Sequence, residues 1–129
     1  MAKNPKSQTK QKKIEIKRGD VFLTNFDPTI GHEIKKTRPA LVIQNNIGNH
    51  YSPITIVAAI TSQFNGPAYP TEVIIESRDS GLPNRSAVVL NQIRSIDKQR
   101  LIKPLGHLNK ELMRSVDEAI EISLGLIEL

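Results

Sequence analysis

The sequence of 129 residues contains no cysteine and no tryptophan, and its aromatic residues are three phenylalanines and two tyrosines. Without cysteine, disulfide bonds and thiolate metal sites are excluded. No apolar run approaches the roughly 18 residues of a membrane-spanning helix. The lysine-rich N-terminus also lacks the apolar segment of a secretory signal. The length of the chain predicts a single domain with a core of modest size. The absence of a secretory signal predicts that this domain is cytoplasmic.

Motifs that bind cofactors or metals are missing as well. There is no GxGxxG sequence, no P-loop and no HExxH sequence, and the three histidines are far apart, at His32, His50 and His107. We therefore expect neither a nucleotide cofactor nor a structural metal.

The formal net charge of +5 comes from one end of the chain. Residues 1–17 hold six lysines and one acid, whereas residues 18–129 hold twelve basic and twelve acidic side chains. The tail can attract phosphates regardless of their sequence, or it can be a solubilising extension. Residues 1–16 are polar and lack periodicity, so we predict a disordered basic tail followed by one domain over residues 17–129.

Five short apolar runs predict strands, at residues 21–26, 39–45, 54–61, 72–76 and 86–93. Turn-forming residues separate them, as at Asp27-Pro28 and in residues 78–84. Strands of this length and spacing favour a mainly β fold (α+β), in which an antiparallel sheet curls into a small barrel. A short helical turn is predicted at residues 95–98, followed by an extended piece near 102–105.

The C-terminal segment has the periodicity of an amphipathic helix. Asn109 is a suitable N-cap, and one face of the helix is expected to pack on the barrel. Its apolar stripe comprises Leu112, Val116, Ile120, Leu124 and Ile127, widened by Met113, Ala119 and Leu126.

Residues 27–45, DPTIGHEIKKTRPALVIQN, run from a polar loop into an apolar strand. Pro39 disfavours the α conformation for Arg38, so the guanidinium leaves the chain at the start of the strand. Residues 40–43 lack polar alternation, which is typical of a strand buried on both faces, and Gly31 permits a turn with positive φ. A binding or reacting site is indicated, because acidic, basic and anion-binding groups gather within seven positions: His32, Glu33, Lys35, Lys36 and Arg38.

Polar residues also mark the ends of two other predicted strands. Thr61, Ser62 and Gln63 follow one apolar run, and Asn91 and Gln92 interrupt another. Because strand ends cluster on a small barrel, Arg38, Thr61 and Gln92 can converge on one surface. Alternatively, these are ordinary strand-edge residues that satisfy turn hydrogen bonds.

Three segments resemble the MazF/PemK family of toxin endoribonucleases, also called mRNA interferases: RGDVFLTNFDPTIGHEIKKTRPALVIQNN, AAITSQ and VLNQIRSIDKQRL. The resemblance runs from about Ile16 to the C-terminus and is strongest to the Gram-positive branch. It implies an SH3-like antiparallel barrel of the CcdB/Kid/MazF type with a C-terminal helix. It also implies that the protein is the toxin of a type II toxin–antitoxin system.

The family's functional residues can be carried over by position. Its catalytic arginine and threonine match Arg38 and Thr61, and its glutamate and glutamine match Glu33 and Gln92, both plausible RNA contacts. His32 stands where relatives often have serine. That histidine either alters base preference or supplies a proton-transfer group.

The resemblance further implies sequence-specific, metal-independent cleavage of single-stranded RNA. The substrate's 2′-OH attacks and leaves a 2′,3′-cyclic phosphate and a 5′-OH. The planar fork of Arg38 suits the phosphate, and the hydroxyl of Thr61 can hydrogen-bond to it. We hypothesise that Glu33 or His32 is the base.

We expect unstacked bases to be read by loop side chains. Phe64 and Tyr69 are available for stacking, although both can equally pack at the barrel rim. The other expected RNA contacts are Asn45, Ser62, Gln63, Gln92 and Lys36.

The implied partners are a second copy of the chain and an antitoxin whose C-terminal segment occupies the RNA groove. The competing hypothesis is a non-catalytic small-barrel module. Such a module would resemble either a gyrase-binding toxin of the same fold or a degenerate binder of RNA or antitoxin.

Overall fold

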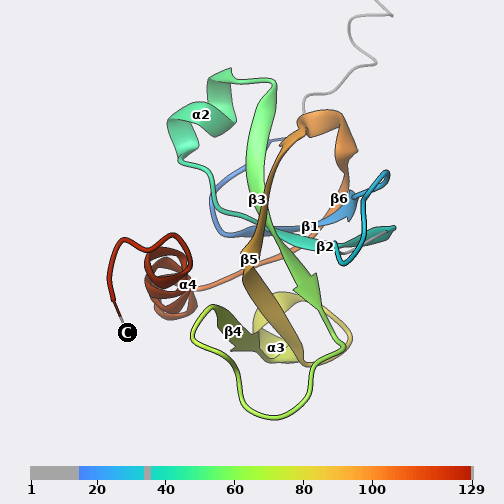
Figure 1. The fold of residues 1–129 in the computed structure, drawn as a ribbon. Helices are drawn as coiled ribbons and strands as arrows, with labels where there is room; N and C mark the ends of the chain where they lie inside the picture. The colour runs from blue at the N-terminus through green and yellow to red at the C-terminus, as the bar shows by residue number, and fades with distance from the viewer. Residues whose placement is uncertain (1–14, 34–35, 129) are drawn as a thin grey trace, which may run out of the picture.

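The computed structural model describes residues 15–33 and 36–128. Its strands form one six-stranded sheet in the order β4-β5-β3-β2-β1-β6, and every neighbouring pair is antiparallel (Figure 1). The strands are β1 (Asp20–Asn25), β2 (Thr37–Val42), β3 (Ile54–Thr61), β4 (Glu72–Ile75), β5 (Ser86–Asp97) and β6 (Leu101–His107). The helices are α2 (Asn46–Tyr51), α3 (Ser77–Ser80), the 3-10 turn η1 (Lys98–Arg100) and α4 (Lys110–Ser123).

The mainly β fold with a C-terminal helix is confirmed, but the predicted barrel is not closed by hydrogen bonds. Within the part of the chain that the structure describes, the edge strands β4 and β6 are not paired. β4 has only four residues, and α3 follows it almost directly. The backbone after α3 instead lies against β6. The approach is so close that a Cβ atom added at Gly81 would come within 2.1 Å of the Leu105 carbonyl oxygen. A helix end thus fills the gap that a strand pair would have closed.

The sheet has a separate apolar core on each face, since successive side chains of a strand point to opposite sides. On one face, α4 packs against β4 and β5 through its buried residues Val116 and Ala119. The other face is lined by a smaller cluster that includes Phe22, Phe26 and Ala59. Strands β2 and β3 contribute to both clusters, so the apolar runs that the sequence showed there are explained.

Helix α4 begins where the sequence predicts and ends earlier. The side chain of Asn109 caps it by accepting a hydrogen bond from the Leu112 amide at 2.9 Å. Gly125 adopts a positive φ of 73°, which turns the chain out of the helix after Ser123. Ile120 still lies in the helix and packs on the core. Three residues of the predicted stripe lie beyond the helix and are 41–68% exposed: Leu124, Leu126 and Ile127.

Other boundaries differ from the prediction for local reasons. The helical turn predicted at residues 95–98 is wrong up to Asp97, because β5 continues to that residue opposite β3. Residues 46–51, which lie between two of the predicted strands, form a helix that Asn45 caps by accepting a hydrogen bond from the Gly48 amide at 2.8 Å. Of the predicted tail, residues 1–14 lie outside the described residues. Ile16 is buried in the smaller apolar cluster, together with Phe22 and Phe26. None of the helices in the described chain is long and apolar enough to cross a membrane.

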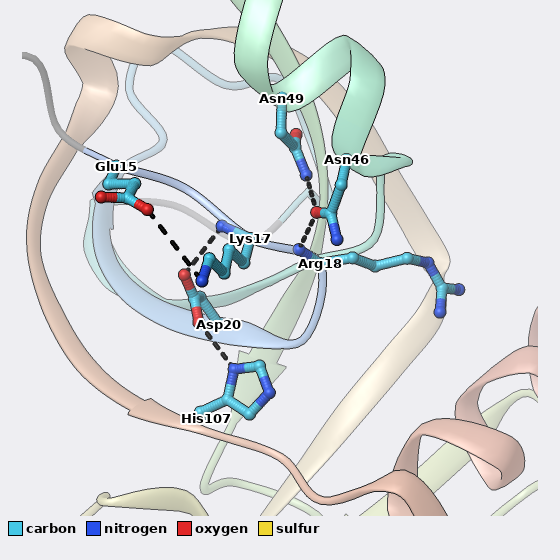
Figure 2. A network of polar contacts seen from close by, with 7 residues as sticks. All are labelled: Glu15, Lys17, Arg18, Asp20, Asn46, Asn49 and His107. Atoms are coloured by element: carbon cyan, nitrogen blue, oxygen red, sulfur yellow. Dashed lines mark hydrogen bonds and ion pairs between the residues drawn. The ribbon is translucent and has the colours of Figure 1, made fainter.

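A polar network fastens the start of β1 to its neighbours (Figure 2). Asp20 accepts a hydrogen bond from the Lys17 amide at 2.9 Å and contacts Nδ1 of His107 at 2.6 Å, which joins β1 to the end of β6. Arg18 reaches in the other direction. Its guanidinium contacts Asp117 of α4 at 2.5 Å and the carbonyl oxygen of Ile43 at 2.9 Å. One short segment therefore ties together the end of β6, the residue after β2 and α4.

Asn49 is the buried polar centre of the α2 region and is 3% exposed. Its Oδ1 accepts hydrogen bonds from the Thr55 hydroxyl at 2.7 Å and from Gln44 Nε2 at 3.1 Å. Its Nδ2 donates to the carbonyl oxygen of Gln44 at 2.8 Å. Because Thr55 is fully buried, its hydroxyl depends on Asn49 for a partner.

We predict that Asn49→Ala lowers the free energy of unfolding by about 2–3 kcal/mol, because it leaves buried polar groups unpaired. Urea unfolding followed by circular dichroism measures the change. The matched control is Gln99→Ala, which removes an exposed amide and should change the free energy by less than about 0.5 kcal/mol. Equal losses in the two variants would contradict the role assigned to Asn49.

Candidate active site

Arg38 and Thr61 lie opposite each other at the ends of two paired strands. Ala40 pairs with Ala59 and Leu41 with Ala58, and the same antiparallel register, continued by two positions, sets Arg38 opposite Thr61. On its other side Arg38 pairs with Thr24 of β1. The predicted convergence of these two residues therefore follows from strand pairing, and both side chains are half-buried.

The hydroxyl of Thr61 is held in place by its own turn. It accepts a hydrogen bond from the amide of Gln63 at 3.0 Å and lies 3.4 Å from the carbonyl oxygen of the same residue. This is the turn hydrogen bonding that the sequence offered as an alternative to a functional role. The two are compatible here, because the turn fixes the position of a hydroxyl that remains partly accessible.

The loop between β1 and β2 is anchored through its backbone. Arg94 of β5 donates to the carbonyl oxygen of Phe26 at 2.6 Å, and its guanidinium lies 5.9 Å from the centre of the Phe26 ring. Arg100 donates to the carbonyl oxygens of Asn25, at 3.1 Å, and Asp27. Two arginines from distant parts of the sequence thus fix the start of the loop.

Within the loop, Gly31 has the expected positive φ of 59°. The Glu33 carboxylate accepts a hydrogen bond from the amide of Ile30 at 2.6 Å, which orients it within the loop. Lys36 has a φ of 66°, unusual for a residue other than glycine, and its amide donates to Asp27 at 2.9 Å. Lys35, the remaining charge of the predicted group, lies outside the described residues.

A first cleft of about 400 Å³ opens beneath this loop. His32 and Glu33 line it from the loop, and Gln92 lines it from β5. The rest of its lining comprises Phe26, Ala59, Asn91, Ile93 and Arg94. Acidic, amide, imidazole and guanidinium groups therefore share one concave surface with an apolar floor.

Gln92 reaches this cleft because β5 bulges. The pairing of β5 with β3 shifts between Ala58 and Ala59, which pair with Ile93 and Val89, so Leu90, Asn91 and Gln92 lie in an irregularity of the strand. Bulges of this kind redirect side chains and are frequent next to active sites. The sequence predicted a strand end at Asn91 and Gln92, but β5 continues to Asp97, and the polar interruption of the apolar run marks this irregularity instead.

A second cleft of about 360 Å³ opens beside Arg38. Arg38 itself lines it, together with Lys36 and Ser62. The opposite wall comes from the segment between α3 and β5, at Leu82, Pro83, Asn84 and Ser86. No feature of the sequence drew attention to this wall, because turn residues carry no periodic pattern.

The other predicted RNA contacts are placed less uniformly. Gln63 and Tyr69 are exposed on the β3–β4 connection, and Phe64 is half-buried there. Asn45 lies apart from the other predicted contacts, because it follows the end of β2 opposite to Arg38. The chain between them spans roughly 20 Å at the rise per residue of an extended strand. The side chain of Asn45 caps α2. Sequence reasoning did not select Phe26, Arg94 or Arg100, whose roles depend on contacts across about 70 residues of chain.

No group of three or more histidine, aspartate or glutamate side chains is placed to hold a metal ion within residues 15–33 and 36–128.

The chain has similarity to known proteins over nearly its whole length. Endoribonuclease EndoA of Bacillus subtilis (strain 168) is 50% identical over 113 residues, which is 88% of this chain and 97% of that protein. The crystal structure of MazF (Form-I) from Deinococcus radiodurans is 26% identical with a TM-score of 0.75, covering 88% of this chain and 99% of the other. An endoribonuclease in complex with its cognate antitoxin from a mycobacterial species shares the fold, at 22% identity and a TM-score of 0.73, covering 88% and 99%.

Residues 17–124 match the family described as PemK-like, MazF-like toxin of type II toxin-antitoxin system. This match spans more than half of the chain and includes both strand ends and the loop that form the two clefts. The chain therefore belongs to the PemK-like, MazF-like toxins of type II toxin–antitoxin systems.

Proposed function

We propose that this protein is a sequence-specific, metal-independent endoribonuclease that cleaves single-stranded RNA. The observation that carries the proposal is the register of β2 and β3. Continued two positions beyond the paired residues, it sets Arg38 opposite Thr61, beside a cleft that Arg38 lines. A relative half identical in sequence, which bears the name endoribonuclease, supports the same reaction.

In the proposed reaction the 2′-oxygen of a ribose attacks the adjacent phosphorus and loses its proton to a base. The bond from phosphorus to the 5′-oxygen breaks, and that oxygen takes up a proton. The products are a 2′,3′-cyclic phosphate and a 5′-OH. Negative charge rises on the phosphoryl oxygens in the transition state, so fixed donors there accelerate the reaction.

Arg38 and Thr61 are suited to that stabilising role. A guanidinium presents parallel N–H donors to two phosphoryl oxygens and stays charged. The Thr61 hydroxyl adds a donor from the facing strand, and its turn holds it in position. Because both groups sit on paired strands rather than on loops, they are held at a fixed spacing when RNA binds.

Glu33 and His32 are the two candidates for the base, since both line the first cleft from the anchored loop. The hydrogen bond from the Ile30 amide orients the Glu33 carboxylate. His32 is exposed in the same loop. We propose that Gln92, which lines the same cleft, hydrogen-bonds with the substrate.

We further propose that a cognate antitoxin neutralises the protein by placing a segment over the RNA site, in keeping with the family to which it belongs. We expect the protein to act as a homodimer in the cytoplasm. Leu124 and Leu126, which are more than 60% exposed, offer apolar surface for a second copy.

The first test is cleavage of a long RNA of little structure in the presence of EDTA, with the equivalent DNA as a negative control. We expect cuts at a recurring short sequence, with cyclic phosphate and 5′-OH ends, and none in DNA because it lacks the 2′-OH. Intact RNA would overturn the proposal in favour of a non-catalytic binding module.

Arg38→Ala should reduce the cleavage rate by about 10²–10³-fold or more, and Thr61→Val by about 10²-fold, because each removes a donor to the charged transition state. Single-turnover kinetics measures both. Arg114→Ala removes an exposed arginine of α4 and should cleave at the wild-type rate. If Arg38→Ala cleaves like Arg114→Ala, the assignment of Arg38 is wrong.

Glu33→Gln and His32→Ala separate the two candidate bases. Loss of the base should lower the rate by about 10²–10⁴-fold, whereas the other variant should keep most of its activity. Glu33→Gln preserves an acceptor for the Ile30 amide, so the loop should stay in place. Near wild-type rates in both variants would remove both residues from the proton transfer.

A further inference from the structure

We propose that the second cleft binds the base of one of the two nucleotides flanking the scissile phosphate, and that Asn84 reads the edge of that base. The inference rests on the proposed endoribonuclease activity and assigns a recognition role to the segment between α3 and β5. That segment lies about 45 residues along the chain from Arg38, and neither sequence patterning nor the resemblance selected it.

The position of the cleft carries the first step. Arg38 lines it directly, and so does Ser62, the residue after Thr61. A phosphate that contacts both Arg38 and Thr61 therefore has a neighbouring nucleoside within reach of the second cleft. The first cleft is lined by Ala59, two residues before Thr61 on β3, so a strand of RNA can run from one cleft to the other past the strand ends.

The chemistry of the walls suits a nucleobase. Pro39 and Ile60 on one side and Leu82 and Pro83 on the other provide apolar surface against the flat face of a ring. Polar groups stand at the rim, where Ser62, Asn84 and Lys36 are all exposed. Apolar walls with a few polar groups are typical of small-molecule and base pockets.

Asn84 is suited to distinguish one base from another. A carboxamide can donate and accept at once and so matches the paired donor and acceptor on a base edge. Among the residues that the structure describes, none forms a hydrogen bond with the Asn84 side chain, which leaves both its donor and its acceptor available. Its backbone carbonyl, in contrast, accepts from the Ser86 hydroxyl at 2.9 Å.

The segment that carries Asn84 is rigidly supported. Leu82 is buried in the core, and its carbonyl oxygen accepts from the Ser77 hydroxyl at 2.5 Å. Arg85 is paired with Glu76 at 3.0 Å. Gly81 lies in direct backbone contact with β6 at Leu105. A base entering the cleft therefore meets a preformed wall, which lowers the entropy lost on binding.

The test compares wild type with Asn84→Ala on a pool of RNA molecules randomised around one cleavage site, with sequencing of the fragments. We expect Asn84→Ala to relax the preference at one position next to the cut by about tenfold, the effect of losing one amide contact with a base. Ser62→Ala should relax the preference at the same position. Gln99→Ala removes an exposed amide that lines neither cleft and should leave the sequence profile unchanged.

Each outcome decides the inference. Relaxation confined to one position next to the cut, in a variant that folds like wild type by circular dichroism, supports it. A wild-type profile in Asn84→Ala overturns it, and so does a uniform fall in rate with no change in preference. In both of those cases wild-type cleavage would still uphold the proposed function. Failure of the wild type itself to cut RNA would overturn both.

Discussion

The antiparallel pairing of β2 with β3 is the constraint on which the rest of the structure depends. It passes through both apolar cores, and its register alone sets Arg38 opposite Thr61. A slip of one residue would move every side chain of a strand to the other face of the sheet. Because both cores would then be lost, the packing of Leu41 and Ala59 preserves the spacing between Arg38 and Thr61.

Local sequence predicted the parts of the fold that depend on near neighbours. The bounds of β3 and the Asn109 cap of α4 were predicted correctly, because apolar runs and caps act over a few residues. The open edge between β4 and β6, by contrast, depends on a backbone contact between Gly81 and Leu105, far apart in sequence. No periodicity encodes such a contact.

The candidate site shows the same division. The resemblance and Pro39 placed Arg38 correctly at the start of a strand, whereas Gln92, predicted at a strand end, lies in a bulge within β5. The roles of Arg94 and Arg100 were not predicted. Each arginine binds backbone carbonyl oxygens, which every residue has, so the identity of the partner residue gives no signal in the sequence. The wall at Asn84 was missed for a different reason: only the folded chain brings it beside Ser62.

The anchoring of the β1–β2 loop through main-chain oxygens has a consequence for divergence within this family. Arg94 and Arg100 recognise carbonyl groups that every residue possesses, so mutations of loop side chains do not remove their hydrogen bonds. The loop can therefore exchange its outward-facing side chains, such as His32, at little energetic cost to the scaffold. Point mutations can therefore change the chemistry of the loop surface while the framework of the fold stays the same.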